Sequence, residues 1–177
     1  MSSAARTLRA AELLAGPWRQ TLNAATMLNQ SKTAHQAEID AAAELIDFWR
    51  YNVEFMLRIY SEQPVSSTGV WNRMEYRPLE GFVFAVSPFN FTAIGCNLSG
   101  SPALMGNTVV WKPASSAMFS AHYLMQLLEE AGLPPGVINI VYGGGRTGMQ
   151  LVEHPLVAKV SFTGGNETGR KIYEAAS

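Results

Sequence analysis

Two polar side chains follow two apolar runs near the middle of this 177-residue chain. Asn90 comes shortly after the run Gly81–Val86, and Lys112 directly follows the run Thr108–Trp111. The amide of asparagine donates hydrogen bonds without a charge, whereas the ammonium of lysine donates them as a cation. If the two runs are neighbouring parallel strands, their carboxyl ends meet at one edge of a sheet, where the ligands of such sheets bind. The pattern therefore predicts one crevice that offers a ligand a neutral donor and a cation.

The segment between these two side chains has the pattern of a strand–helix–strand unit. Gly81–Val86 is apolar without alternation, which fits a strand buried on both faces, although a buried helix gives the same pattern. Pro88 lacks an N–H group and must end the run. The small residues of 93–105 would let a helix lie close to a sheet, and 108–111 is predicted to be the next strand. Together these lengths match a βαβ unit.

The rest of the second half repeats this alternation. Ser115 and Ser116 are placed to cap a helix that runs to about Ala131, where Gly132 can end it. Further strands are predicted at 137–142 and 157–162, and further helices at 147–153 and from about Glu167 onwards. We therefore expect an α/β fold with a partial Rossmann-like parallel sheet, in which helical crossovers join about four strands.

An all-helical arm is expected to precede this sheet. Short helices are predicted at 5–16 and 18–28, and a helix of about 28 residues starts at the capping box of Thr33 and Gln36. Its apolar residues cover too wide a face for a coiled coil, so we expect it to pack on the body of the protein. Four acidic residues are interpreted as its solvated face, namely Glu38, Asp40, Glu44 and Asp47. A polar connection at 61–68 follows, and 69–76 is expected to be an extended edge segment.

The composition argues against several classes of protein. Apolar residues make up 47% of the chain, and the formal net charge of −1 favours neither nucleic acid nor an acidic membrane surface as a partner. A single cysteine excludes an internal disulfide, and no apolar run reaches the roughly 18 residues of a membrane-spanning helix. The three histidines lack metal-ligand spacing, so no metal is expected.

Four motifs carry a family resemblance. They are Ser87-Pro88-Phe89-Asn90-Phe91, Trp111-Lys112-Pro113, Glu130-Ala131-Gly132-Leu133-Pro134-Pro135-Gly136-Val137-Ile138-Asn139 and Phe162-Thr163-Gly164-Gly165. In order and spacing they resemble the aldehyde dehydrogenase superfamily over nearly the whole chain. Within it, Leu79–Ile94 is most similar to the branch that oxidises glutamate γ-semialdehyde to glutamate in proline breakdown, whereas the segment after Gly143 is closer to general aldehyde dehydrogenases. The resemblance implies a helical arm with its connection at 1–76 and the first part of an NAD-binding domain at 77–177.

The resemblance also implies a catalytic role for one residue. In this family a cysteine thiolate attacks the aldehyde, hydride passes to a nicotinamide, and water hydrolyses the thioester. Asn90 would donate its side-chain amide to the carbonyl oxygen as negative charge develops there. The alternative is that Asn90 only bonds the backbone of its own turn.

By the same resemblance, several residues are expected to bind NAD. Lys112 would reach the adenosine ribose, and the helix after Gly165 would turn its N-terminus towards the pyrophosphate. Ser115 stands where many relatives have a glutamate that pairs with the ribose hydroxyls, so repulsion of a 2′-phosphate is missing, although NAD remains favoured over NADP. The other expected contacts are Ser87, Pro88, Phe89, Pro113, Phe162 and Gly164.

Cys96 is not expected to be the nucleophile, because it lies on the small-residue helix, where a buried thiol behaves as a small hydrophobe. The resemblance places the nucleophile and the general-base glutamate beyond Ser177, so the chain looks truncated and is expected not to oxidise an aldehyde alone. Two other interpretations are a non-catalytic nucleotide-binding module and a general aldehyde dehydrogenase with another substrate. The expected partners are a small-molecule aldehyde and, for a full-length relative, further copies of itself. The expected location is the cytoplasm, or the mitochondrial matrix if the source is eukaryotic.

Overall fold

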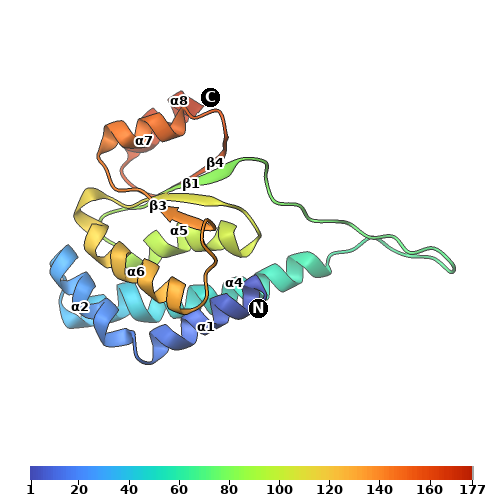
Figure 1. Ribbon diagram of the computed structural model, residues 1–177, viewed down its shortest axis with the longest axis horizontal. Helices are drawn as coiled ribbons and strands as arrows, with labels where there is room; N and C mark the ends of the chain where they lie inside the picture. Colours follow the sequence, from blue (N-terminus) through green and yellow to red (C-terminus); the bar gives the residue numbers. More distant parts are fainter. Residues whose placement is uncertain (177) are drawn as a thin grey trace.

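A four-stranded parallel sheet forms the centre of the computed structural model, which describes residues 1–176 (Figure 1). Its strands are β1 (Phe82–Val86), β2 (Val109–Lys112), β3 (Ile138–Ile140) and β4 (Val157–Phe162). They stand in the order β3-β2-β1-β4, and every neighbouring pair is parallel. The prediction of an α/β fold with a parallel sheet of about four strands is therefore confirmed.

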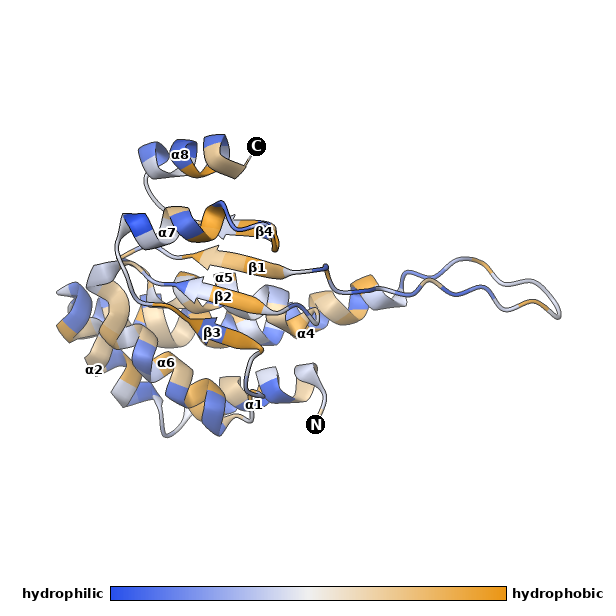
Figure 2. Cartoon of the chain, turned by 45° about the horizontal axis from the view of Figure 1, so that its top comes forward, coloured by the Kyte–Doolittle hydropathy of each residue, from blue (hydrophilic) through white to orange (hydrophobic). Residues whose placement is uncertain are grey.

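Helices cover both faces of this sheet (Figure 2). On one face lie α5 (Thr92–Leu104) and α6 (Met118–Glu130), and on the other lie α7 (Gly145–Val152) and α8 (Asn166–Ala176). Both faces of β1 are consequently buried. Val83 and Ala85 join the core that contains α5 and α6, whereas Phe84 packs with Val152 of α7 and Ile172 of α8. No helix within residues 1–176 combines the length and apolar content needed to cross a membrane.

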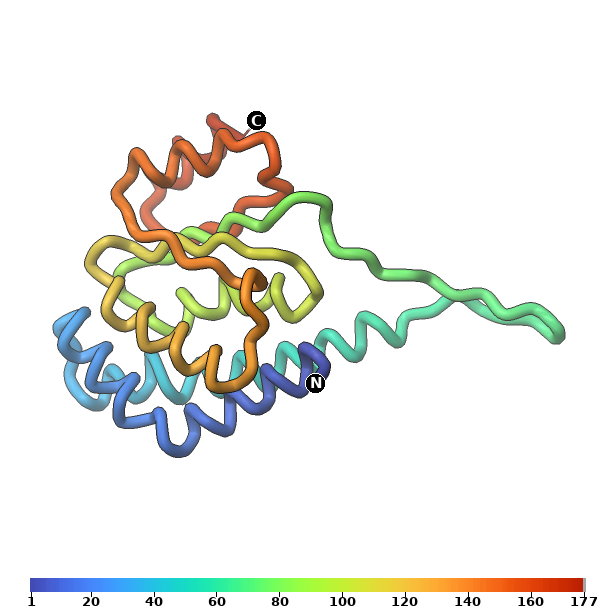
Figure 3. The backbone as a smooth tube through the Cα atoms, in the orientation of Figure 1, coloured from blue at the N-terminus to red at the C-terminus, as the bar shows by residue number. Residues whose placement is uncertain are grey.

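A layer of helices from the first third of the chain packs beneath α5 and α6. It comprises α1 (Ser3–Ala15), α2 (Arg19–Gln30), α3 (Ala34–Ala37), the π-helical segment η1 (Glu38–Ala43) and α4 (Glu44–Ser61). The last three form one continuous rod in Figure 3, and the predicted capping box at its start is present. Leu45, Ile46 and Trp49 of α4 are buried in the main core, which confirms that this rod packs on the body of the protein. The π-helical segment was not expected.

The chain between α4 and β1 projects away from the rest of the structure (Figures 1 and 3). The prediction of an extended edge segment at 69–76 is wrong, because these residues pair with no strand of the described chain. Its polar backbone groups instead bond side chains across the loop. Asn72 N donates to Ser66 Oγ at 2.9 Å, and Met74 N donates to Gln63 Oε1 at 2.8 Å. Residues with high strand propensity stay irregular here because no sheet edge lies within reach.

Candidate functional site

The carboxyl ends of three strands lie level at one edge of the sheet. Val86, the last residue of β1, pairs in register with Lys112 of β2 and with Phe162 of β4. After β1 the chain enters α5 on one face, and after β4 it enters α8 on the other face (Figure 2). A reversal of this kind opens a crevice at the ends of the strands, where ligands of parallel sheets bind. The Asn90 turn, which follows β1, and Lys112, the last residue of β2, therefore lie at the carboxyl ends of neighbouring strands.

The turn after β1 is fastened to β2. Ser87 is buried, and its Oγ accepts a hydrogen bond of 2.9 Å from Trp111 Nε1, while its backbone N donates to Lys112 O at 3.2 Å. Pro88 is buried as well, but Phe89 is 63% exposed. The hydroxyl of Ser87 is therefore used inside the protein, and the ring of Phe89 is the part of this turn that a ligand can reach.

The side-chain amide of Asn90 is half-buried and forms no hydrogen bond with any group of residues 1–176. Had Asn90 only stabilised its own turn, its side chain would bond a nearby backbone group. Instead its backbone carbonyl accepts a hydrogen bond from Lys32 Nζ, and the amide is left available. The geometry thus favours a donor that awaits a ligand over a turn-capping residue.

Lys112 is only 7% exposed, although it ends a strand. Its Nζ donates to Pro113 O at 3.3 Å, and within the described residues it pairs with no carboxylate. A methyl group built on Gly148 of α7 would lie 3.5 Å from Lys112 Cδ, so the lysine stem lies along this glycine. Burial lowers the pKa of Lys112 because the charged form loses solvation. The ammonium keeps donors that an oxygen-rich ligand can take up.

Ser115 lies in a short 3-10 turn, η2 (Ser115–Ala117), before α6. Its Oγ donates to Gly143 O at 3.4 Å, which ties the end of β2 to the glycine loop after β3. The predicted capping by Ser115 and Ser116 is wrong, since no side chain caps η2 or α6. The chain makes a 3-10 turn after buried Pro113, so that α6 begins only at Met118 and not directly after a capping serine.

The loop after β4 is shaped by the ring of Phe162. A methyl group on Gly164 would lie 2.7 Å from Phe162 Cζ, so the ring covers this position and leaves room only for glycine. Nothing lies within 4 Å of the same point on Gly165. Gly165 O accepts a hydrogen bond of 3.0 Å from Gly169 N in the first turn of α8. The free N–H groups of that turn lie next to the loop, at the end of the strand.

A polar cluster that the sequence reasoning missed lies beside the Asn90 turn. Lys32 forms an ion pair with Asp40, and Glu44 has one carboxylate oxygen that is buried without a hydrogen-bond partner in the described chain. Burial, followed by the charge of Asp40, raises the pKa of Glu44. The interpretation of Glu38, Asp40, Glu44 and Asp47 as one solvated face is therefore wrong, because only Asp47 is exposed. A π-helical turn holds more residues than an α-helical one, so η1 rotates later residues away from their expected face.

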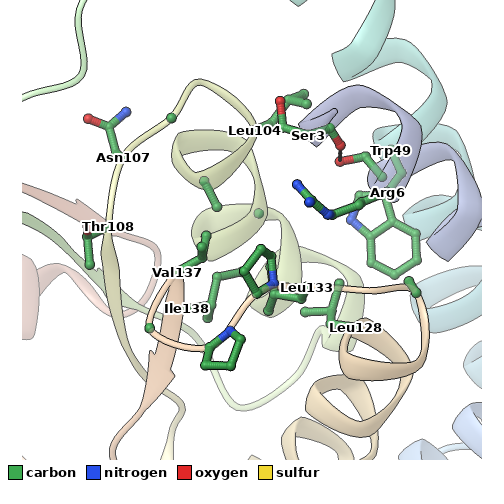
Figure 4. Close-up of a pocket in the computed structure, with 18 residues that line it drawn as sticks. Ser3, Arg6, Trp49, Leu104, Asn107, Thr108, Leu128, Leu133, Val137 and Ile138 are labelled. Atoms are coloured by element: carbon green, nitrogen blue, oxygen red, sulfur yellow. Dashed lines mark hydrogen bonds between the residues drawn. The ribbon is translucent and has the colours of Figure 1, made fainter. Parts of the chain in front are cut away.

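A cavity of about 420 Å³ lies at the opposite end of the sheet (Figure 4). Asn107 and Thr108, which precede β2, line it together with Val137, which precedes β3. Figure 4 shows Arg6 and Trp49 lining another side of this cavity. None of the predicted site residues contributes to its wall. We therefore place the candidate site at the carboxyl ends of the strands, where the chemistry-bearing side chains lie, and not in this cavity.

Comparison with known proteins identifies the family and several relatives of this chain. A family model described as "Aldehyde dehydrogenase family" matches residues 3–177. A Delta-1-pyrroline-5-carboxylate dehydrogenase of Agaricus bisporus is 51% identical over 175 residues, and a mitochondrial one of Emericella nidulans is 53% identical over 168 residues. These matches cover 98% and 94% of this chain, but only 32% and 29% of the relatives.

A solved structure is also similar to this chain in sequence and in fold. It is the Delta-pyrroline-5-carboxylate dehydrogenase of Mycobacterium tuberculosis bound with NAD, which is 55% identical and superposes with a TM-score of 0.95. The match covers 98% of this chain and 33% of that one. The chain thus spans about a third of the length of the relatives that it matches.

Proposed function

Because the chain belongs to the aldehyde dehydrogenase family, we propose that it supplies the oxyanion donor and part of the NAD site of an enzyme that oxidises glutamate γ-semialdehyde to glutamate. The observation that carries this proposal is the side-chain amide of Asn90, which has no hydrogen-bond partner among residues 1–176 and follows β1 beside the end of β2, where Lys112 lies. The names of the similar proteins support the substrate, and the NAD-bound relative supports the cofactor.

Asn90 acts on the carbonyl oxygen of the aldehyde in this proposal. When a nucleophile adds to the carbonyl carbon, the oxygen becomes negatively charged, and the Asn90 amide donates a hydrogen bond to it. A single fixed donor of this kind contributes about 2.7–4 kcal/mol to transition-state stabilisation. Bound NAD supplies the acceptor for the hydride that leaves the carbon.

The cofactor would lie across the ends of β2, β1 and β4. We assign the adenosine ribose to Lys112, because its ammonium is desolvated and, within the part of the chain that the structure describes, donates only to Pro113 O. The pyrophosphate is assigned to the N-terminus of α8, next to Gly164 and Gly165. Phe89 offers its exposed ring to the cofactor, and Ser115 offers a hydroxyl to the ribose. Because position 115 carries this hydroxyl and not a carboxylate, no negative charge there repels the 2′-phosphate of NADP. The preference for NAD over NADP therefore rests on the remaining contacts.

Glu44 supports the choice of substrate. Glutamate γ-semialdehyde carries an ammonium group, which calls for a carboxylate in the site. Within residues 1–176 one carboxylate oxygen of Glu44 has no hydrogen-bond partner. Glu44 also lines a surface hollow with Ile39 and Phe48, and it belongs to the cluster in which Lys32 contacts the Asn90 turn. A general aldehyde dehydrogenase with an apolar substrate would have no use for this carboxyl group.

Titration of the chain with NAD tests the cofactor assignment. We expect saturable quenching of tryptophan fluorescence, and the variant Lys112→Met should bind about 10- to 100-fold more weakly, because it loses a hydrogen bond made by a charged group. The exposed lysine variant Lys159→Met is the matched control and should bind as the parent does. Absence of saturable NAD binding, or equal binding by the Lys112 variant, contradicts the assignment. Binding without turnover is also the result expected for a non-catalytic nucleotide-binding module.

The substitution Lys112→Met, which should weaken NAD binding, is not expected to lower the stability of the chain at neutral pH. Burial lowers the pKa of Lys112 in the folded chain, so between that pKa and the ordinary value of 10.5 the unfolded chain binds more protons. The contribution of Lys112 to stability therefore improves as the pH rises through this alkaline window. Lys112→Met should fold at least as stably as the parent at neutral pH and should lack this rise, which urea titrations at several pH values measure. A loss of stability on substitution would show that the buried ammonium is stabilised within the chain.

The thiol of Cys96 is expected to be inert in the folded chain. It is fully buried, and burial raises its pKa from 9.0 to about 12, which by itself lowers the thiolate fraction about 1000-fold near neutral pH. Labelling by a disulfide reagent at pH 8 should therefore be at least about 1000-fold slower than in urea. Since Cys96 is the one cysteine of the 177 residues, aldehyde oxidation by this chain alone is not expected. Rapid labelling under native conditions would show that the Cys96 thiol is reactive, and Cys96 would again be a candidate nucleophile.

Three further points belong to this proposal. We propose that 1–76 act as a helical arm with its connection and 77–177 as the first part of the NAD-binding domain. For the location we propose the mitochondrial matrix if the source is eukaryotic, and otherwise the cytoplasm. The names of several eukaryotic relatives include the word mitochondrial. The family resemblance supports association with further copies in a full-length relative.

A further inference from the structure

Three hydrogen bonds join α2 and the connection after it to the turn that carries Asn90 and to Thr92, the first residue of α5. Thr26 Oγ1 lies 2.9 Å from Thr92 Oγ1, and Gln30 Nε2 donates to the same oxygen at 2.9 Å. Lys32 Nζ donates to Asn90 O. These contacts join segments that lie about sixty residues apart in the sequence. The helical layer is therefore connected directly to the turn, and not only through the core beneath it.

The ammonium of Lys32 has three partners. It forms an ion pair with Asp40 of η1, donates to the carbonyl of Asn90, and lies 4.4 Å from the centre of the Phe91 ring. Its side chain is only 12% exposed, so water competes weakly for these contacts. Hydrogen bonds made by a charged donor are stronger than neutral ones, and a desolvated cation also gains from an aromatic face. Lys32 therefore holds two consecutive residues of the turn.

The backbone on both sides of Lys32 is fixed as well. Ser31 ends α2 in a left-handed conformation with φ of 52°, and Thr33 opens α3 with the capping box. A lysine on a free loop would lose much side-chain and backbone entropy when it bound a partner. Here the short connection between two helices limits that loss. The contact from Lys32 to the turn is consequently preorganised.

We propose that Lys32 is the positioning residue for Asn90. The side chain of Asn90 bonds no group of residues 1–176, so its direction depends on the backbone from which it projects. Lys32 fixes that backbone through the carbonyl of the same residue. An oxyanion donor must be held at about 2.7–3.1 Å from the place where charge develops, and an unsupported donor loses its effect. The inference rests on the proposed role of Asn90 as this donor.

Three variants of the 177-residue chain separate positioning from general support. Lys32→Met keeps the stem but removes the donors, and Lys32→Arg keeps a cation. Arg19→Met is the matched control, because Arg19 makes a similar ion pair with Glu38 in the same helical layer without touching the turn. If Lys32→Met does not fold, Asp40→Asn serves in its place, since it frees Lys32 from its carboxylate and should act in the same direction with a smaller effect.

The readouts are the side-chain NH₂ resonances of Asn90 and the hydrogen exchange of Gly95 N–H, both measured without cofactor. Gly95 N donates to Phe91 O at 3.1 Å and so reports opening of the turn, while Val83 N, bonded to Thr108 O at 2.9 Å, reports opening of the sheet. In Lys32→Met we expect broadened or shifted Asn90 resonances and about 10- to 100-fold faster exchange at Gly95, with Val83 changed less than about threefold. Lys32→Arg should restore most of the parent behaviour, and Arg19→Met should leave both readouts unchanged.

Two results would overturn the proposal. One is an unchanged Asn90 signal in Lys32→Met. The other is equal acceleration at Gly95 and Val83, which would mean that Lys32 only supports the fold as a whole. Because these measurements contain no NAD, failure of the cofactor assignment would leave them intact, and their failure would leave the NAD titration intact.

Discussion

Gly81→Ala is expected to lower the free energy of unfolding by about 2–5 kcal/mol. Gly81 has φ of 87°, a conformation in which an alanine costs about 1–2 kcal/mol. In addition, its new methyl group would lie 2.1 Å from the backbone oxygen of Leu156, which cannot move without disturbing β4. That oxygen accepts the hydrogen bond of 2.9 Å from Phe82 N that begins the β1–β4 pairing. A clash with backbone adds about 1–3 kcal/mol or more. Urea titration followed by circular dichroism measures the loss.

Gly132→Ala is the matched control for this effect. Gly132 also has positive φ, at 94°, but nothing lies within 4 Å of the added methyl group. It should lose only the conformational part, about 1–2 kcal/mol. Equal losses in the two variants would mean that the contact between Gly81 and Leu156 relaxes without cost, contrary to our expectation.

Trp111→Ala should lower the free energy of unfolding by about 3–5 kcal/mol, as is usual for a buried tryptophan. Trp111 is 1% exposed, and its indole touches the position of Gly95 on α5 while its Nε1 donates to Ser87 Oγ. The substitution leaves a cavity between sheet and helix, and it also releases the turn that leads to Asn90. NAD binding should therefore weaken even under conditions where the variant is folded. Urea titration measures the loss of stability. Isothermal titration calorimetry measures NAD binding without relying on tryptophan fluorescence.

Trp71→Ala controls for the loss of an indole elsewhere. Trp71 is 76% exposed on the projecting loop, so its removal should change stability by less than about 0.5 kcal/mol. A Trp111 variant that matched the Trp71 variant in both measurements would show that the β2 tryptophan does not anchor the turn.

Apolar runs and glycines were sufficient to predict the sheet. Gly81–Val86 and 157–162 differ from β1 and β4 by no more than one residue. β1 is buried on both faces, so its apolar run has no polar position that would leave its ends uncertain. The segment 137–142 was predicted longer than β3, which is Ile138–Ile140. β3 pairs with Val109–Trp111 of β2, and this pairing sets its length. Pairing with adjacent strands determines where such a strand begins and ends, and this pairing cannot be read from a single sequence.

The candidate site was predictable in position but not in detail. Asn90 and Lys112 could be placed because the carboxyl ends of neighbouring parallel strands lie at the same end of the sheet. The burial of Lys112 depends on Gly148 of α7, and the use of the Ser87 hydroxyl depends on Trp111. These are tertiary contacts without a local pattern. Glu44 was misplaced for a different reason, since the π-helical segment before it shifts the helical register.

The position of β1 between β2 and β4 also determines how the chain can assemble. Val83 meets Val109 of β2 after one helix, but Phe82 meets Val157 of β4 only after two more crossovers. Closing so long a loop is slow compared with forming local helices. The helical layer with β1, β2 and β3 can therefore condense first, and until β4 arrives one side of β1 carries unpaired N–H and C=O groups. During refolding this open side is a template for a strand from another molecule, so aggregation competes with the last pairing step.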